Sequence, residues 1–146
     1  MAKLATVGKS HKHDSAKLHV SGTAIYIDDM REMTGLVHVA PGYAAETCGE
    51  IISIDLEAVK KSAGVICVLT VDDIPAINDC SPVMGDDPIF AEGEILFHGQ
   101  VVFAVVAKTR DLARRATKKA IIKINAKTPM ITAADGRKHD ASVFPA

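Results

Sequence analysis

The sequence is poor in aromatic residues. Trp is absent, and aromatics make up 4% of the chain, whereas 48% of its 146 residues are hydrophobic. A core built from this composition must consist mainly of Ile, Val, Leu and Ala. The hydrophobic fraction is ordinary for a folded protein, and the length suits one domain.

Strong net charge and paired cysteines are also lacking. The formal net charge is −1, so we expect no general attraction to nucleic acid or to a membrane surface. The three cysteines Cys48, Cys67 and Cys80 are an odd number without CxxC spacing, which favours reduced thiols in a cytoplasmic protein. The N-terminus lacks an apolar signal core, and no apolar run approaches the roughly 20 residues of a spanning helix.

Motifs of common catalysts are missing as well. The sequence contains no glycine-rich phosphate loop, no HExxH and no GxSxG. We therefore assign no catalytic, cofactor-binding or metal-binding residue. His11 and His13 could form a metal pair, but a site needs more ligands at defined geometry. A solvated tail is the preferred interpretation of the polar stretch Met1–Ser21.

The clearest structural signal lies between Phe97 and Asn125. Val101–Ala107 is an unbroken apolar run that predicts a strand buried on both faces. Thr109 is suited to cap a following helix, whose apolar stripe leaves Arg110, Arg114 and Arg115 on other faces. Ile121–Asn125 predicts the next strand.

A second strand–helix–strand pattern precedes it. Glu50–Asp55 predicts a strand, Asp55 is a plausible cap for a short helix, and Gly64 is placed to end that helix in the left-handed conformation. Val65–Leu69 predicts the returning strand, with Cys67 as a small buried hydrophobe. The crossover of about nine residues is short for a parallel connection. We therefore predict an α+β fold with a mixed sheet and two strand–helix–strand units.

The remaining segments are shorter and less regular. His19–Tyr26 is consistent with a turn into a strand, and Leu36–Ala40 predicts a half-buried strand carrying His38 on its surface or partly buried. Pro41–Gly49 is interpreted as a loop. Thr70 with Asp73 resembles a capping box for one turn.

Charge is unevenly distributed along the chain. Lys and Arg are absent from Ser62 through Ala107, a span that includes the long Pro/Gly/Asp loop Ala76–Glu94. The spacing of its carboxylates does not match an EF-hand. The complementary basic cluster Lys108–Lys119 is interpreted as a solvated helix face. Gln100 could either contact a ligand or satisfy backbone groups of its turn.

Several short motifs, taken in order, resemble one known family. They are Gly8–Ala16, His19–Asp29, Ile52–Asp55, Gly64-Val65, Leu69-Thr70, Asp73-Ile74-Pro75, Asn78, Asp86–Ala91, Gly99–Ala107, Ala113, Ala116 and Ala120. Together they resemble the start of the molybdopterin-binding large subunit of bacterial xanthine dehydrogenase, the α/β-hammerhead domain of the xanthine dehydrogenase/aldehyde oxidase family.

The resemblance implies a hammerhead domain at residues 14–130, a flexible tail at 1–13 and a linker at 131–146 toward molybdenum-binding domains. It implies a structural role in a molybdenum hydroxylase that oxidises purines. The fragment alone would be inactive. In that family the large subunit holds the molybdenum cofactor, while 2Fe-2S clusters and FAD lie on other domains or subunits.

The implied partners are the molybdenum-binding domains of the same subunit and the FAD/iron–sulfur subunit, with no nucleic acid and no membrane. An isolated domain with its apolar face uncovered would self-associate. The alternative is a free-standing α+β interaction module that recruits a partner through the loop Ala76–Glu94 or the basic helix. Binding that weakens as salt rises would mark that alternative.

Overall fold

The computed structural model describes residues 6–141, which divide into two compact units, one up to Gly35 and one from Leu36 onward. We call these the N-terminal unit and the C-terminal unit and describe each by itself. The predicted tail 1–13 and linker 131–146 extend into positions 1–5 and 142–146, which lie outside the described residues. None of the described helices is long and apolar enough to cross a membrane.

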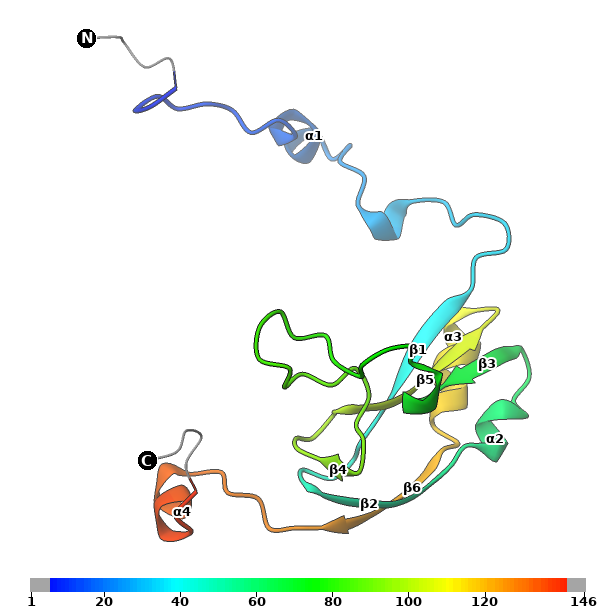
Figure 1. Cartoon of the computed structure of the whole chain (residues 1–146). Helices are drawn as coiled ribbons and strands as arrows, with labels where there is room; N and C mark the ends of the chain where they lie inside the picture. The colour runs from blue at the N-terminus through cyan, green and yellow to red at the C-terminus, as the bar shows by residue number, and fades with distance from the viewer. Residues whose placement is uncertain (1–5, 142–146) are drawn as a thin grey trace. The chain divides into compact units, whose positions relative to one another are not determined.

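Among its described residues, the N-terminal unit contains the helix α1 (Ala16–Ser21) and one 3-10 turn, Ile27–Asp29 (Figure 1). The strand expected within His19–Tyr26 is therefore wrong. Gly22 ends α1 at φ 71°, and the backbone N–H of Tyr26 donates to Asp29 Oδ2 at 3.1 Å. A strand in this segment would have needed a neighbouring strand for its backbone hydrogen bonds. The turns satisfy backbone groups locally instead, and they override the β-propensity of the segment.

The C-terminal unit contains six strands and three α-helices among its described residues. In chain order they are β1 (His38–Tyr43), β2 (Gly49–Asp55), α2 (Glu57–Lys60), β3 (Val65–Leu69), β4 (Glu94–Ile95), β5 (Val101–Ala107), α3 (Arg110–Thr117), β6 (Ile121–Ala126) and α4 (Ala133–Lys138). A second 3-10 turn, Val71–Asp73, follows β3. It begins where Thr70 N–H donates to Asp73 Oδ2 at 2.8 Å, as the capping-box pattern predicts.

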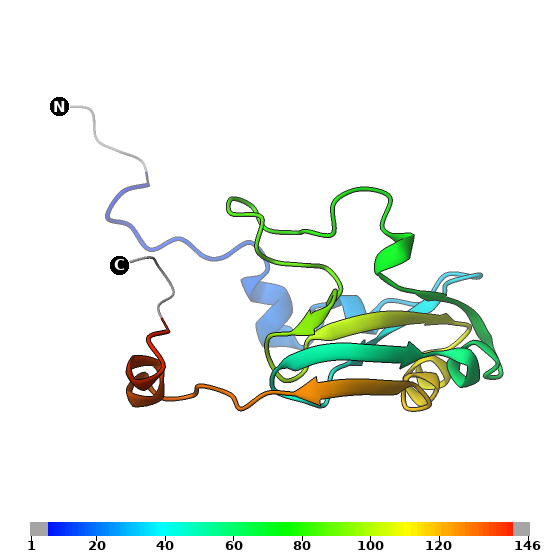
Figure 2. The same cartoon turned by 60° about the horizontal axis from the view of Figure 1, so that its bottom comes forward.

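The strands form two three-stranded sheets. Sheet A has the order β1-β5-β3 and sheet B has the order β4-β2-β6. Every pairing is antiparallel, and Figure 2 shows β2 and β6 running side by side. The α+β fold and the two strand–helix–strand units are confirmed. The single mixed sheet is replaced by two antiparallel sheets, because each unit leads from one sheet to the other and its two strands never pair.

The core lies around β5. Five of its seven residues are at most 7% exposed, and the pattern confirms a strand covered on both faces. Helix α3 buries Ala113 and Ala116 completely. The largest fully buried side chains of the core are Phe103, Ile95, Val59, Val102 and Val105. The predicted aliphatic core is therefore present, with Phe103 as its main aromatic member.

Some boundaries differ from the sequence prediction. The strand β1 continues through Pro41 to Tyr43, a stretch that was expected to be a loop. Proline is tolerated there because β1 is an edge strand and one missing N–H need not break a ladder. Asp55 lies one residue before the helix cap, yet its Oδ1 accepts from Glu57 N at 2.9 Å. Gly64 adopts φ 77°, as expected for a helix end.

Candidate interaction surface

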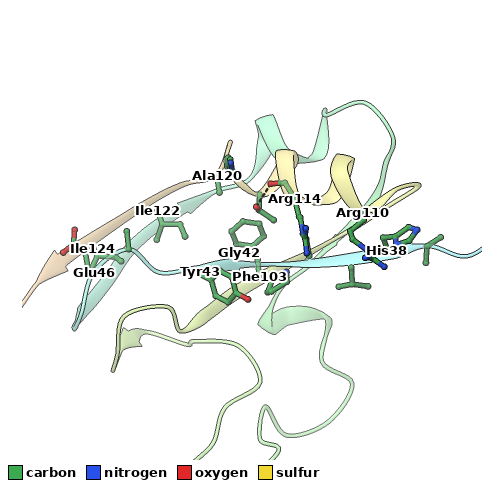
Figure 3. A pocket seen from close by; sticks show the side chains of 17 residues that line it. His38, Gly42, Tyr43, Glu46, Phe103, Arg110, Arg114, Ala120, Ile122 and Ile124 are labelled. Atoms are coloured by element: carbon green, nitrogen blue, oxygen red, sulfur yellow. Dashed lines mark hydrogen bonds between the residues drawn. The ribbon is translucent and has the colours of Figure 1, made fainter. Parts of the chain in front are cut away.

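A groove runs along β1 in the C-terminal unit. Its volume is about 1060 Å³, and it is bounded by β1, α3 and β6 (Figure 3). We call it the β1 groove. Its lining residues are Val37, His38, Val39, Ala40, Pro41, Gly42, Tyr43, Ala45, Glu46, Phe103, Arg110, Arg114, Thr117, Lys118, Ala120, Ile122 and Ile124.

Helix α3 supplies the basic wall of the groove. Thr109 caps the helix by accepting from Leu112 N–H at 3.2 Å, as the sequence predicts. Arg110, Arg114 and Lys118 are spaced four residues apart, so they project from one side of the helix. Figure 3 shows Arg110 and Arg114 extending from α3 toward β1. Arg115 points elsewhere, where its Nε donates to Asp111 Oδ1 at 3.0 Å.

The remaining wall of the groove is apolar. Phe103 is 1% exposed and lies opposite Gly42, while Ala120, Ile122 and Ile124 are half-buried and reach the groove from the region of β6. Glu46 is the one carboxylate among the lining residues. An apolar surface with a row of cations beside it is suited to bind an elongated amphipathic ligand with negative charge.

His38 lies in the groove at the start of β1 and is half-buried, which agrees with the expected half-buried strand. Tyr43, at the other end of the strand, is 57% exposed. The lining residues contain no cysteine or serine beside a base, and therefore no nucleophile of the Ser–His or Cys–His kind. The apolar and charged lining is suited to binding.

The acidic loop Ala76–Glu94 is braced by two side chains. Asn78 joins the two ends of the loop: its Nδ2 donates to the Phe90 carbonyl at 2.8 Å, and its Oδ1 accepts from Phe90 N–H at 3.0 Å. Asp79 Oδ1 accepts from the N–H groups of Ser81 and Asp87, both at 3.1 Å. These bonds, that from the Ser81 backbone above all, hold the pKa of Asp79 below its ordinary value. The carboxylate therefore acts as a structural brace.

Cys67 and Cys80 both have exposed side chains. Cys67 is exposed, so the prediction of a buried hydrophobe is wrong, because β3 forms an edge of sheet A and turns this side chain to solvent. Cys80 is exposed as well, and its Sγ donates to the Asp87 carbonyl at 3.3 Å. Desolvation, together with the nearby Asp87 carboxylate, raises the pKa of this thiol. A raised pKa lowers the thiolate fraction and hence the reactivity of Cys80.

Gln100 satisfies its own turn, the second of the two readings that the sequence left open. It is 4% exposed, and its Oε1 accepts from Leu96 N–H at 2.8 Å. The bond ties the segment after β4 to the start of β5. A buried backbone donor without this partner would be costly.

The described residues contain no group of three or more His, Cys, Asp or Glu side chains placed to hold a metal ion. His11 is exposed, and His13 Nδ1 accepts from Ser15 N–H at 3.2 Å.

The chain matches the family model described as "Aldehyde oxidase and xanthine dehydrogenase, a/b hammerhead domain" over residues 21–127, more than half of its length. The chain belongs to this hammerhead family. The two antiparallel sheets joined by two strand–helix–strand units are thus the hammerhead fold of this chain. The resemblance expected from the ordered motifs is confirmed.

Named relatives agree with this assignment. A xanthine dehydrogenase from Dictyostelium discoideum is 34% identical over 134 residues, covering 92% of this chain and 10% of that protein. A xanthine dehydrogenase from Oryza sativa subsp. japonica is 36% identical over 116 residues, covering 80% of this chain and 8% of that protein. The chain therefore spans about a tenth of these relatives.

A solved structure shares the hammerhead fold over nearly the whole chain. The aldehyde oxidoreductase from Desulfovibrio desulfuricans ATCC 27774 superposes with a TM-score of 0.83 at 25% identity, covering 92% of this chain and 16% of that one.

The β1 groove was not predicted from the sequence, because the basic residues of α3 were interpreted as a solvated helix face. Their spacing of four was the available signal.

Proposed function

We propose that this chain is the hammerhead domain of a xanthine dehydrogenase-type molybdenum hydroxylase and serves it as an architectural part. The named relatives include xanthine dehydrogenases from two organisms, and they are about ten times longer than the matched segment. Purine oxidation would then be the activity of the whole enzyme, located in the cytoplasm. This chain would contribute contacts and not reacting groups.

The observation that carries the proposal is a large groove without reactive machinery. The β1 groove combines an apolar wall with cations, while the described residues bring together no metal-ligand cluster. A domain built this way can hold a neighbouring polypeptide in position. Substrate chemistry needs groups that these residues do not assemble.

The cofactors follow from the same proposal. The molybdenum cofactor would belong to domains beyond this chain, and 2Fe-2S clusters and FAD to other domains or subunits. The partners would be the molybdenum-binding domains and the FAD/iron–sulfur subunit. Residues 14–130 would form the hammerhead domain, with 1–13 as a tail and 131–146 as a linker. The family match over residues 21–127 supports the central limits.

Two measurements on the purified chain test the architectural role. We expect no xanthine oxidation and no bound molybdenum from the chain alone. We also expect a stable complex when it is mixed with a polypeptide that carries the molybdenum-binding domains. Activity or stoichiometric molybdenum in the isolated chain would contradict the proposal, and so would failure to form the complex.

A further inference from the structure

Two of the strands that line the β1 groove are edge strands. Among the described strands, β1 pairs only with β5 and β6 pairs only with β2, so each leaves one edge without a neighbouring strand. Both strands line the same groove. Unpaired strand edges offer backbone donors and acceptors to an added extended segment.

We propose that the β1 groove holds an extended acidic segment of the molybdenum-binding polypeptide, with apolar and acidic side chains in alternation. This deepens the proposed function and rests on it. Alternation follows from strand geometry, since successive side chains point to opposite sides. One set would face the apolar wall at the half-buried Ile122 and Ile124, and the other would face the cations of α3.

The spacing of the cations fits such a segment. Residues four apart on a helix are separated by about 6 Å along its axis. Alternate residues of a strand are separated by roughly 6.6 Å. Arg114 and Lys118 can therefore each meet one carboxylate of a segment that runs alongside α3. Arg114 and Lys118 are exposed, and within the described chain neither is assigned a carboxylate partner.

A second copy of this chain is a poorer occupant. The edge strand β1 reads HVAPGY and contains no carboxylate, so pairing β1 with itself would bring the two basic walls together without neutralising them. Charge complementarity therefore selects an acidic partner.

The first test uses the chain with a synthetic probe, a hexapeptide amide of alternating Val and Glu, matched to the six residues of β1. We expect NMR shift changes that cluster at β1, α3 and β6. The matched peptide of alternating Val and Lys should not bind there. Equal binding of both peptides, or shift changes confined to other elements, would overturn the proposal.

Charge reversal gives the second test. The double variant Arg114→Glu, Lys118→Glu should bind the acidic peptide about tenfold more weakly, since two exposed attractions become repulsions. The control is Lys60→Glu, Lys123→Glu, which makes the same change in net charge at exposed sites outside the groove. The control should bind within about twofold of the parent chain, because salt screens distant charges. Equal weakening by both pairs would overturn the proposal.

The same two variants, mixed with the molybdenum-binding polypeptide, separate this proposal from the proposed function. Weaker assembly of the groove variant alone supports both. Assembly that is unchanged by the groove variant overturns the groove assignment and leaves the architectural role standing. If the parent chain does not assemble at all, the architectural role fails, and the groove assignment to that polypeptide fails with it.

Discussion

Gly42 and Phe103 lie directly opposite each other in the antiparallel pairing of β1 with β5, and the Phe103 ring occupies the space that a Cβ at position 42 would need. The glycine backbone thus forms one face of the pocket that holds the ring. Covering a strand glycine with a cross-strand aromatic is a known way to stabilise such a pair. Phe103 is also the point where the core meets the β1 groove.

The first prediction concerns this pair. Gly42→Ala should lower the free energy of unfolding by about 1–3 kcal/mol, because the added methyl overlaps the buried ring. Urea denaturation followed by circular dichroism measures the loss. In the Phe103→Leu background, which shortens the side chain, the same substitution should cost clearly less. Equal costs in both backgrounds would show that the ring is not the obstacle.

The second prediction concerns the turn after α2. Gly64 has φ 77°, and a Cβ there would lie 2.5 Å from Leu112 Cδ1. Gly64→Ala should therefore destabilise the protein by about 1–2 kcal/mol through the backbone conformation alone, with the contact adding to the loss. The control is Gly136→Ala in α4, where φ is not positive and the nearest atom is 3.7 Å away. Similar losses from both substitutions would contradict this account.

The third prediction concerns the acidic loop. Asp79→Ala removes the acceptor of the Ser81 and Asp87 N–H groups, so these amides should exchange with deuterium faster, while Asp86→Ala should leave them unchanged. Because the pKa of Asp79 is lowered in the folded state, its contribution is complete above the unfolded-state pKa and is lost as the pH falls through the folded-state value. Loop protection that is flat with pH in the acid range would contradict the role of the carboxylate.

The fourth prediction concerns uncovered apolar side chains on sheet B. Ile52 is 61% exposed on β2 and Ile121 is 55% exposed on the adjacent β6. We expect the isolated chain to self-associate as its concentration rises, and Ile52→Glu with Ile121→Glu to reduce this in sedimentation measurements. Ile77→Glu is the control, since Ile77 is exposed in the acidic loop, away from the sheets. A parent chain that remains monomeric at high concentration would contradict the prediction.

Local signals in the sequence were sufficient for most elements. The apolar run of β5, the Thr109 cap and the Gly64 turn depend on residues close together in the chain, so pattern and propensity predicted them. The strand prediction for the N-terminal segment was wrong because two kinds of local signal conflicted. There, Gly22 and Asp29 formed turns in a stretch whose Val, Ile and Tyr residues favour strands.

Long-range relationships could not be predicted from the sequence. Alternation does not state which strands pair, so the separation into two antiparallel sheets emerged only from the structure. The same limit explains the β1 groove. Its walls come from segments around residues 40, 114 and 122, and the charges of α3 acquire a role only when β1 lies beside them. Cys67 was predicted to be buried because a short apolar run does not indicate whether its strand lies at the edge or in the middle of a sheet.

The pairing pattern has a consequence for biosynthesis. Each of the four strand pairings joins a segment before residue 70 to one after residue 93, and the shortest separation, Leu69 to Ala104, is 35 residues. No hairpin can form early as the polypeptide leaves the ribosome. Since β1 and β3 pair only with β5 among the described strands, both must stay unpaired until Val101–Ala107 has been made, and slow folding is expected.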